Sequence, residues 1–78
     1  MSENVLILNR VREIAGDVLE SPVTSESTAE TVEAWDSVRH LNLMLALEAE
    51  YGFELSPEEM DEAKSIGQIA QLVASKRS

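Results

Sequence analysis

The sequence predicts an all-α fold: a small bundle of four helices, with a long loop between the first two and a short third helix. Apolar residues recur at helical spacing in separate segments, and residues typical of helix ends lie between these segments. No segment alternates polar and apolar residues for long enough to form a strand. With 78 residues, the chain has room for one domain, residues 1–78, and a single modest core.

Helical spacing of apolar residues predicts the first helix, with charged residues on the opposite side. The apolar residues are Ile7, Leu8, Val11, Ile14, Ala15, Val18 and Leu19. Residues 20–34, ESPVTSESTAETVEA, predict a long connecting loop, because they are rich in Ser, Thr and Glu and contain only Val23 and Val32 as isolated large apolar residues. Loops of this length are uncommon in compact domains and usually have a function.

A second helix is expected over residues 38–51. Asp36 is a suitable N-cap, and Gly52 is well placed to end the helix in a left-handed conformation. Residues 43–47 are five consecutive apolar residues, and no single helix face can bury five in a row. Packing against three other helices accounts for most of this apolar surface, but one or two exposed leucines would form a docking surface.

Capping residues predict the last two helices. A short third helix over residues 57–62 follows from SPEE at 56–59, which supplies a serine cap, a proline at the first helical position and a glutamate that reaches back. Ser65 and Gln68 repeat the capping pattern before the fourth helix, which is expected to end near Lys76 and Arg77, where cations suit the helix dipole. Its apolar side comprises Ile66, Ile69, Ala70, Leu72 and Val73.

Charge and cysteine content exclude several functions. The net charge of -9 repels nucleic acids and anionic membranes and attracts basic patches on other proteins. The absence of cysteine excludes disulfides, thiolate metal sites and a protein thiol nucleophile, so any sulfur chemistry needs an attached group. The N-terminal stretch is unlike a signal peptide and nothing reaches membrane-spanning length, which predicts a soluble, cytoplasmic protein. The two termini favour a standalone chain, and a monomer is expected.

Acidic residues are concentrated between positions 48 and 62, where there is no Lys or Arg. The seven acids are Glu48, Glu50, Glu54, Glu58, Glu59, Asp61 and Glu62. They fit either a solvated face or a surface that docks basic partners. No spacing typical of a calcium loop is present, so no metal site is expected.

The start of the second helix is the most informative stretch. Asp36 and Ser37 taken alone are weak evidence, because both residues are preferred helix caps. Arg39 and His40 place cations in the first helical turn, where they oppose the helix dipole unless Asp36 or a bound anion offsets them. A catalytic dyad of Ser37 and His40 is geometrically conceivable, since residues three apart can be neighbours, but no third group is present to orient it.

The whole stretch AWDSVRHLNLMLALEAEYGF, followed by a capped acidic helix, resembles an acyl carrier protein of the phosphopantetheine-bearing family. The resemblance spans nearly the full chain, and the Trp-Asp-Ser variant is more similar to standalone carriers of specialised pathways than to the housekeeping fatty-acid carrier. It implies the four-helix acyl-carrier fold and a covalent 4'-phosphopantetheine, derived from coenzyme A and attached to Ser37, with Asp36 and Val38 as motif neighbours. Val38 replaces the usual leucine.

The resemblance also implies partners. A phosphopantetheinyl transferase would modify the chain, and acyl- or aminoacyl-loading enzymes and downstream transferases or synthases of fatty acid, polyketide or nonribosomal peptide biosynthesis would use it. The second helix is the main recognition surface of related carriers, which points to Arg39, Leu41, Leu45 and Glu48 as partner contacts here. Leu43, Leu47 and Tyr51 are expected in the core.

Physical chemistry independently accounts for a modified serine at this point. A helix N-terminus stabilises an anion such as a phosphodiester, and a flexible arm ending in a thiol supplies the sulfur that the chain lacks. The protein would then be a carrier and not an enzyme. Two alternatives remain open: an unmodified acidic adaptor that binds a partner through the second helix, and a small hydrolase using Ser37 and His40.

Overall fold

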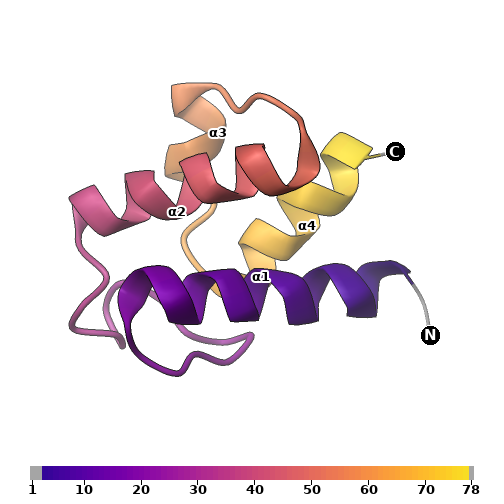
Figure 1. Ribbon diagram of the computed structural model, residues 1–78. Helices are drawn as coiled ribbons and strands as arrows, with labels where there is room; N and C mark the ends of the chain where they lie inside the picture. The colour runs from indigo at the N-terminus through magenta and orange to yellow at the C-terminus, as the bar shows by residue number, and fades with distance from the viewer. Residues whose placement is uncertain (1–2, 78) are drawn as a thin grey trace.

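The computed structural model describes residues 3–77, which form four helices and no strand. They are α1 (Glu3–Leu19), α2 (Ser37–Tyr51), α3 (Pro57–Glu62) and α4 (Ile66–Arg77). The predicted all-α class is confirmed, with its long loop and short third helix. Figure 1 shows α1 and α2 side by side in opposite directions, with α3 over α2 and α4 crossing near the end of α2. Within the described residues, no helix is both long and apolar enough to cross a membrane.

One apolar core joins α1, α2 and α4, and no polar or charged side chain of residues 4–76 is fully buried in it. The helical residues are Ile7, Val11, Ala15 and Leu19 of α1, Leu43, Met44 and Leu47 of α2, and Ile66, Ile69, Ala70 and Val73 of α4. The long loop contributes Val23, Val32 and Trp35, the apolar residues that stand alone in its sequence. The loop is therefore anchored in the core at three points and not draped over the surface.

The helix α2 ends at the predicted residue and begins at Ser37, one residue before the predicted start, and both predicted caps are present. Asp36 is extended and its Oδ1 accepts a hydrogen bond of 2.8 Å from the Arg39 amide, which makes it the N-cap. Gly52 adopts a left-handed conformation with φ of 72°, and its amide donates to the Glu48 carbonyl at 2.8 Å. Both caps use local chemistry, so Ser37 is fixed as the first residue of the helix.

The short α3 is held mainly by its ends. Ser56 and Glu59 form the predicted capping box, and none of the six helical residues is buried. The Glu59 carboxylate also pairs with Lys76 of α4 at 2.8 Å. The hydrogen bond from Lys76, with those from Ser56, lowers the pKa of Glu59 below its ordinary value. The helix is therefore attached to the bundle by this ion pair, by Met60, which packs against the core, and by the buried Leu55 and Ala63 on either side of it.

The loop between α1 and α2 is bonded to the beginning of α4. The amides of Ile66 and Gly67 donate to the carbonyls of Ser27 and Ser25, at 3.0 and 2.9 Å. A Cβ on Gly67 would lie 3.1 Å from the Ser25 carbonyl oxygen, so the glycine permits this close approach. Loop carbonyls thus satisfy two of the donors that a helix N-terminus leaves without partners.

The cap of α4 differs in one detail from the prediction. Ser65 accepts a hydrogen bond from the Gln68 amide at 3.1 Å, as the capping pattern predicts. The Gln68 side chain, however, accepts from the Lys64 amide at 2.8 Å. In a capping box it would bond to Ser65 instead.

Candidate functional site

Ser37 lies on the surface at a fixed point. It is exposed and follows the N-cap Asp36, which in turn follows the buried Trp35. Trp35 is only 3% exposed and anchors the end of the loop in the core. The sequence Trp-Asp-Ser therefore combines an anchor, a cap and an accessible hydroxyl in three consecutive residues.

The N-terminus of α2 retains free donors beside this hydroxyl. The cap Asp36 satisfies the Arg39 amide. The amides of Ser37 and Val38 donate to no atom of the residues that the structure describes. Unpaired amides at a helix N-terminus, together with the helix dipole, stabilise an anion. A phosphodiester on the Ser37 oxygen fits this position, whereas loop carbonyls already occupy the corresponding donors of α4.

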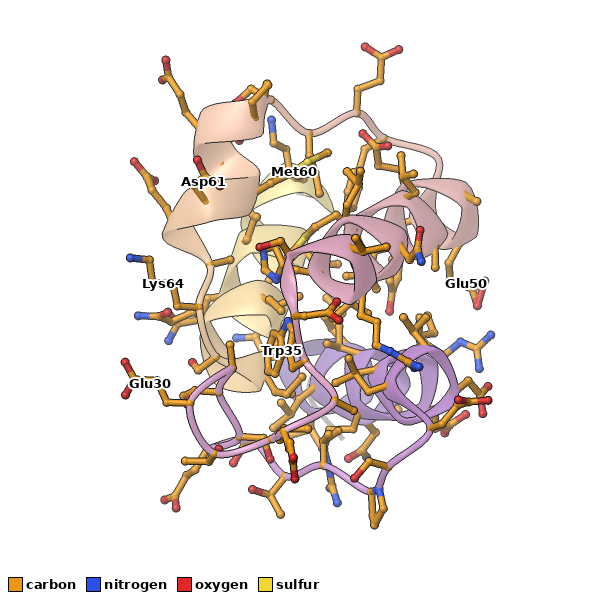
Figure 2. All side chains as sticks on the ribbon, turned by 90° about the vertical axis from the view of Figure 1, so that its left-hand side faces the viewer. Glu30, Trp35, Glu50, Met60, Asp61 and Lys64 are labelled. Carbon is orange, nitrogen blue, oxygen red and sulfur yellow. The ribbon has the colours of Figure 1, made fainter. Side chains whose placement is uncertain are left out.

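A groove of about 860 Å³ begins at Ser37 and is lined by the loop, α2, α3 and the start of α4. Figure 2 looks toward this side of the molecule: Trp35 and Met60 lie toward the middle, with Glu30, Asp61 and Lys64 around the outside. The lining residues are Thr28, Ala29, Glu30, Trp35, Asp36, Ser37, His40, Leu41, Pro57, Met60, Asp61, Lys64, Ser65 and Gln68. The groove thus offers apolar surface edged by polar groups, next to the hydroxyl.

His40 lies in the wall of this groove and uses both ring nitrogens. Its Nδ1 accepts a hydrogen bond from Trp35 Nε1 at 3.0 Å, and its Nε2 lies 2.8 Å from the Met60 carbonyl oxygen. The imidazole also stacks on the indole, with ring centroids 5.9 Å apart. The structure brings His40 into contact with these two residues and leaves it no free nitrogen to activate Ser37 in this arrangement.

The apolar residues of α2 divide into two faces. Leu43, Met44 and Leu47 are completely buried. The prediction that Leu43 and Leu47 lie in the core is therefore confirmed. Leu41 and Leu45 are 48% and 49% exposed. Tyr51 is partly buried against the core. The run of five apolar residues therefore does leave leucine on the surface, and Val38, which is 68% exposed, extends this surface to Ser37.

Two of the predicted partner contacts have bonds within the chain. The Arg39 guanidinium donates to the Val18 carbonyl at 3.0 Å and pairs with Glu20 at 3.6 Å, so it joins α2 to the end of α1. The Glu48 carboxylate accepts a hydrogen bond of 2.6 Å from the Leu55 amide and orders the segment before α3. A partner role for Arg39 and Glu48 stays a prediction, to which the structure adds these internal roles.

The seven acids between residues 48 and 62 divide into those that bond within the chain and those that face solvent. Glu48, Glu50 and Glu59 bind groups inside the chain; Glu50 pairs with Arg10 of α1 and the pKa of Arg10 is raised by that hydrogen bond. The remaining acids, Glu54, Glu58, Asp61 and Glu62, are exposed. Within the described part of the chain, no three His, Asp or Glu side chains are grouped so as to hold a metal ion. The free acids therefore form a surface for basic groups.

Together these features define a helical domain that presents an exposed serine at a helix N-terminus, beside a groove and an apolar helix face. A family model described as a phosphopantetheine attachment site matches residues 9–73. The chain belongs to this family of phosphopantetheine-bearing carrier proteins, as the resemblance implied. Family members are generally not catalytic, and they interact with phosphopantetheinyl transferases and biosynthetic enzymes.

Comparison with solved structures supports the same conclusion. The solution NMR structure of a holo acyl carrier protein from Geobacter metallireducens superimposes with a TM-score of 0.80 and 32% sequence identity. The match covers 90% of this chain and 84% of the other. No curated protein matched the sequence closely enough to add to these findings. The predicted cofactor, a covalent 4'-phosphopantetheine, and the predicted carrier class are confirmed, and the adaptor alternative is not favoured.

Sequence reasoning missed the contribution of Trp35 and Met60 to the site. The bond from Trp35 to His40 spans the helix start, and the bond from His40 to Met60 uses a backbone carbonyl twenty residues away. A buried indole N–H needs an acceptor, and the ring of His40, five residues further on, is one of the side chains near Trp35 in the sequence that can accept. That requirement is the signal that could have found the pair.

Proposed function

We propose that Ser37 is the residue that carries the 4'-phosphopantetheine arm, and that the protein tethers acyl or aminoacyl intermediates on it as thioesters. The observation that carries the proposal is the exposed Ser37 hydroxyl beside free amides at the start of α2. In this proposal residues 1–78 act as a single carrier domain and as a cytoplasmic monomer, and the chain itself makes no covalent bond in its cargo.

The residues around Ser37 suit the product of this modification. The serine oxygen would form the new bond to phosphorus, while the transferase supplies the metal ion that stabilises displacement from coenzyme A. The amides of Ser37 and Val38 then face the phosphodiester, and the dipole of α2 favours its charge. Asp36 occupies the Arg39 amide and leaves these two amides free.

The arm would supply chemistry that the chain lacks. With no cysteine, the protein has no thiol of its own, and the thiol at the end of the arm provides the acceptor for a thioester. The groove of about 860 Å³ beside Ser37 offers the arm and a small cargo a sheltered position between visits to partner enzymes. Catalysis then takes place in those enzymes.

Partner enzymes are proposed to dock on the outer face of α2. Val38, Leu41 and Leu45 offer exposed apolar surface close to Ser37, and the exposed acids of residues 54–62 would attract basic patches. The transferase, the acyl- or aminoacyl-loading enzymes and the downstream transferases or synthases would share this surface. Arg39 and Glu48 are proposed to shape it through their bonds to Val18 and Leu55 and to contribute contacts at its border.

Intact mass spectrometry tests the attachment residue. The purified chain is incubated with a broad-specificity phosphopantetheinyl transferase, magnesium and coenzyme A, beside Ser37→Ala. Ser56→Ala is the matched control, because Ser56 also lies at a helix N-terminus and is exposed. Gain of one phosphopantetheine by the parent and by Ser56→Ala, but not by Ser37→Ala, is the expected result. Modification of Ser37→Ala would refute the assignment.

A further inference from the structure

The pair formed by Trp35 and His40 has a property that the carrier function does not require. We propose that His40 is a pH-operated latch: its neutral ring ties the loop to α3, and protonation releases Trp35 and loosens the loop wall of the groove. The proposal concerns the unmodified chain and does not depend on which residue carries the arm.

The chemistry of its two partners fixes the form of the ring. An indole N–H can only donate, so His40 Nδ1 must carry no hydrogen to accept the 3.0 Å bond from Trp35. A carbonyl oxygen can only accept, so Nε2 must carry the hydrogen for the 2.8 Å bond to Met60. The observed contacts therefore define a neutral ring with its hydrogen on Nε2.

The bond to Met60 replaces one that α3 does not make. In a longer helix the Met60 carbonyl would accept from the amide four residues later, which is that of Lys64. Here the Lys64 amide donates to the Gln68 side chain instead. His40 thus caps an open carbonyl near the end of a helix that has no buried residue of its own.

The latch connects three walls of one groove. Trp35 ends the loop, His40 lies in the first turn of α2 and Met60 lies in α3, and all three line the groove beside Ser37. In Figure 2 the labelled Trp35 and Met60 lie below and above the start of α2, on the sides from which they reach the ring. Loss of one bond therefore changes how two walls are held relative to each other.

Protonation acts on one of the two bonds. A charged imidazolium carries hydrogens on both nitrogens and can accept no hydrogen bond. Its Nδ1–H would face the indole N–H at the distance where Trp35 now donates, so the bond to Trp35 is lost. Trp35 is 3% exposed, and leaving its N–H without an acceptor there is costly. The bond to Met60 survives, because Nε2 keeps its hydrogen.

The charged groups around the ring oppose each other in part. Glu30 from the loop, Asp36 from the cap of α2 and Asp61 from α3 favour an imidazolium, and Lys64 opposes it. The N-terminal end of α2 also opposes the charge, and Arg39 in the same turn points its guanidinium to Val18 at the end of α1. None of these groups supplies a new acceptor for Trp35 when the ring is charged.

The sequence makes the latch directly measurable, since it contains one Trp and one His. The test records the ring nitrogen shifts and the indole N–H signal by NMR from about pH 8 to about pH 5, the range in which histidines ordinarily titrate. We expect the Nε2–H form at the upper end. As the ring charges, protection of the indole N–H from exchange, relative to free tryptophan at the same pH, should fall about tenfold, the equivalent of one hydrogen bond.

His40→Gln is the matched control, because a neutral amide can accept from Trp35 and donate to Met60 at every pH. Its indole protection should not depend on pH over this range. Four results would overturn the proposal: the Nδ1–H form at about pH 8, a ring still neutral at about pH 5, a charged ring with the indole still protected, or the same loss in His40→Gln. The first three are read from the parent chain alone, so they hold even if the variant does not fold.

Discussion

The division of α2 into a buried and an exposed face can be tested with two leucines in the same helix. Leu47 is completely buried and Leu45 is 49% exposed. The substitutions Leu47→Ala and Leu45→Ala remove the same atoms two residues apart. We expect the first to act on stability and the second on partner enzymes.

The magnitudes follow from burial. Leu47→Ala leaves a cavity in the core and should lower the free energy of unfolding by about 3–5 kcal/mol. Leu45 is about half buried, so Leu45→Ala loses about half of the free energy that full burial of the side chain would contribute and leaves no closed cavity. The free energy of unfolding should therefore fall by about 1 kcal/mol. A domain of this size has about 4–12 kcal/mol in all, and Leu47→Ala therefore removes a large part of it.

Urea unfolding monitored by Trp35 fluorescence measures both values, since this single buried indole reports on the core. With a slope of about 1 kcal/mol per molar urea, the midpoint should shift by about 3 M or more for Leu47→Ala and by about 1 M for Leu45→Ala. The same two proteins are then assayed for kcat/KM with the phosphopantetheinyl transferase. Leu45→Ala should lose about five- to thirtyfold, as expected for a contact worth 1–2 kcal/mol.

Ala49 offers a control for the assay, because Ala49→Ser on the exposed side of the same helix should leave kcat/KM unchanged and lower the free energy of unfolding by only about 0.5 kcal/mol. Equal losses of stability in Leu45→Ala and Leu47→Ala would refute the assignment of the two faces. An unchanged kcat/KM for Leu45→Ala, in a protein that remains folded, would remove Leu45 from the docking surface.

Three further predictions concern single contacts. Glu48→Ala should lower the free energy of unfolding by about 1–2 kcal/mol in chemical denaturation, because the Leu55 amide loses its charged acceptor; an effect within error would contradict the 2.6 Å bond. The lowered pKa of Glu59 implies a contribution to stability that is complete above its ordinary value of 4.5 and is lost as the pH falls through the lowered value. Thermal unfolding from neutral to acidic pH should show this loss in the parent and a shallower one in Glu59→Gln. Glu20 has a positive φ of 54°, so Glu20→Gly should raise the free energy of unfolding by about 0.5–1 kcal/mol, and a decrease would show that its pair with Arg39 matters more than the strain.

The sequence predicted those features that depend on neighbouring residues. The limits of α2 and α3 were predictable because Asp36, Gly52 and Ser56 bond to amides or carbonyls within four residues of themselves. The accessible hydroxyl of Ser37 follows from the same local chemistry. The exposed leucines were predictable as a class, since five consecutive apolar residues exceed what one helix face can bury.

Contacts between distant segments could not be predicted from the sequence. Nothing local to Arg39 indicates that it reaches Val18, and nothing local to Glu48 indicates the amide of Leu55. The bond between His40 and Met60 depends on how α3 lies against α2, which is fixed only when the core has packed. Such bonds redirect residues that would otherwise be assigned to the surface, and for this reason the partner contacts were the least predictable part of the site.

The attachment of the loop to α4 has a consequence for protein synthesis. The carbonyls of Ser25 and Ser27, which precede Ser37 in the chain, find their donors only in Ile66 and Gly67. A ribosome-bound chain that has not yet exposed residues 66–77 therefore lacks the partner on which the loop before Ser37 is ordered. This part of the loop therefore completes its bonding only after the last helix has emerged, whereas the cap at Asp36 that fixes the start of α2 uses only the nearby Arg39 amide.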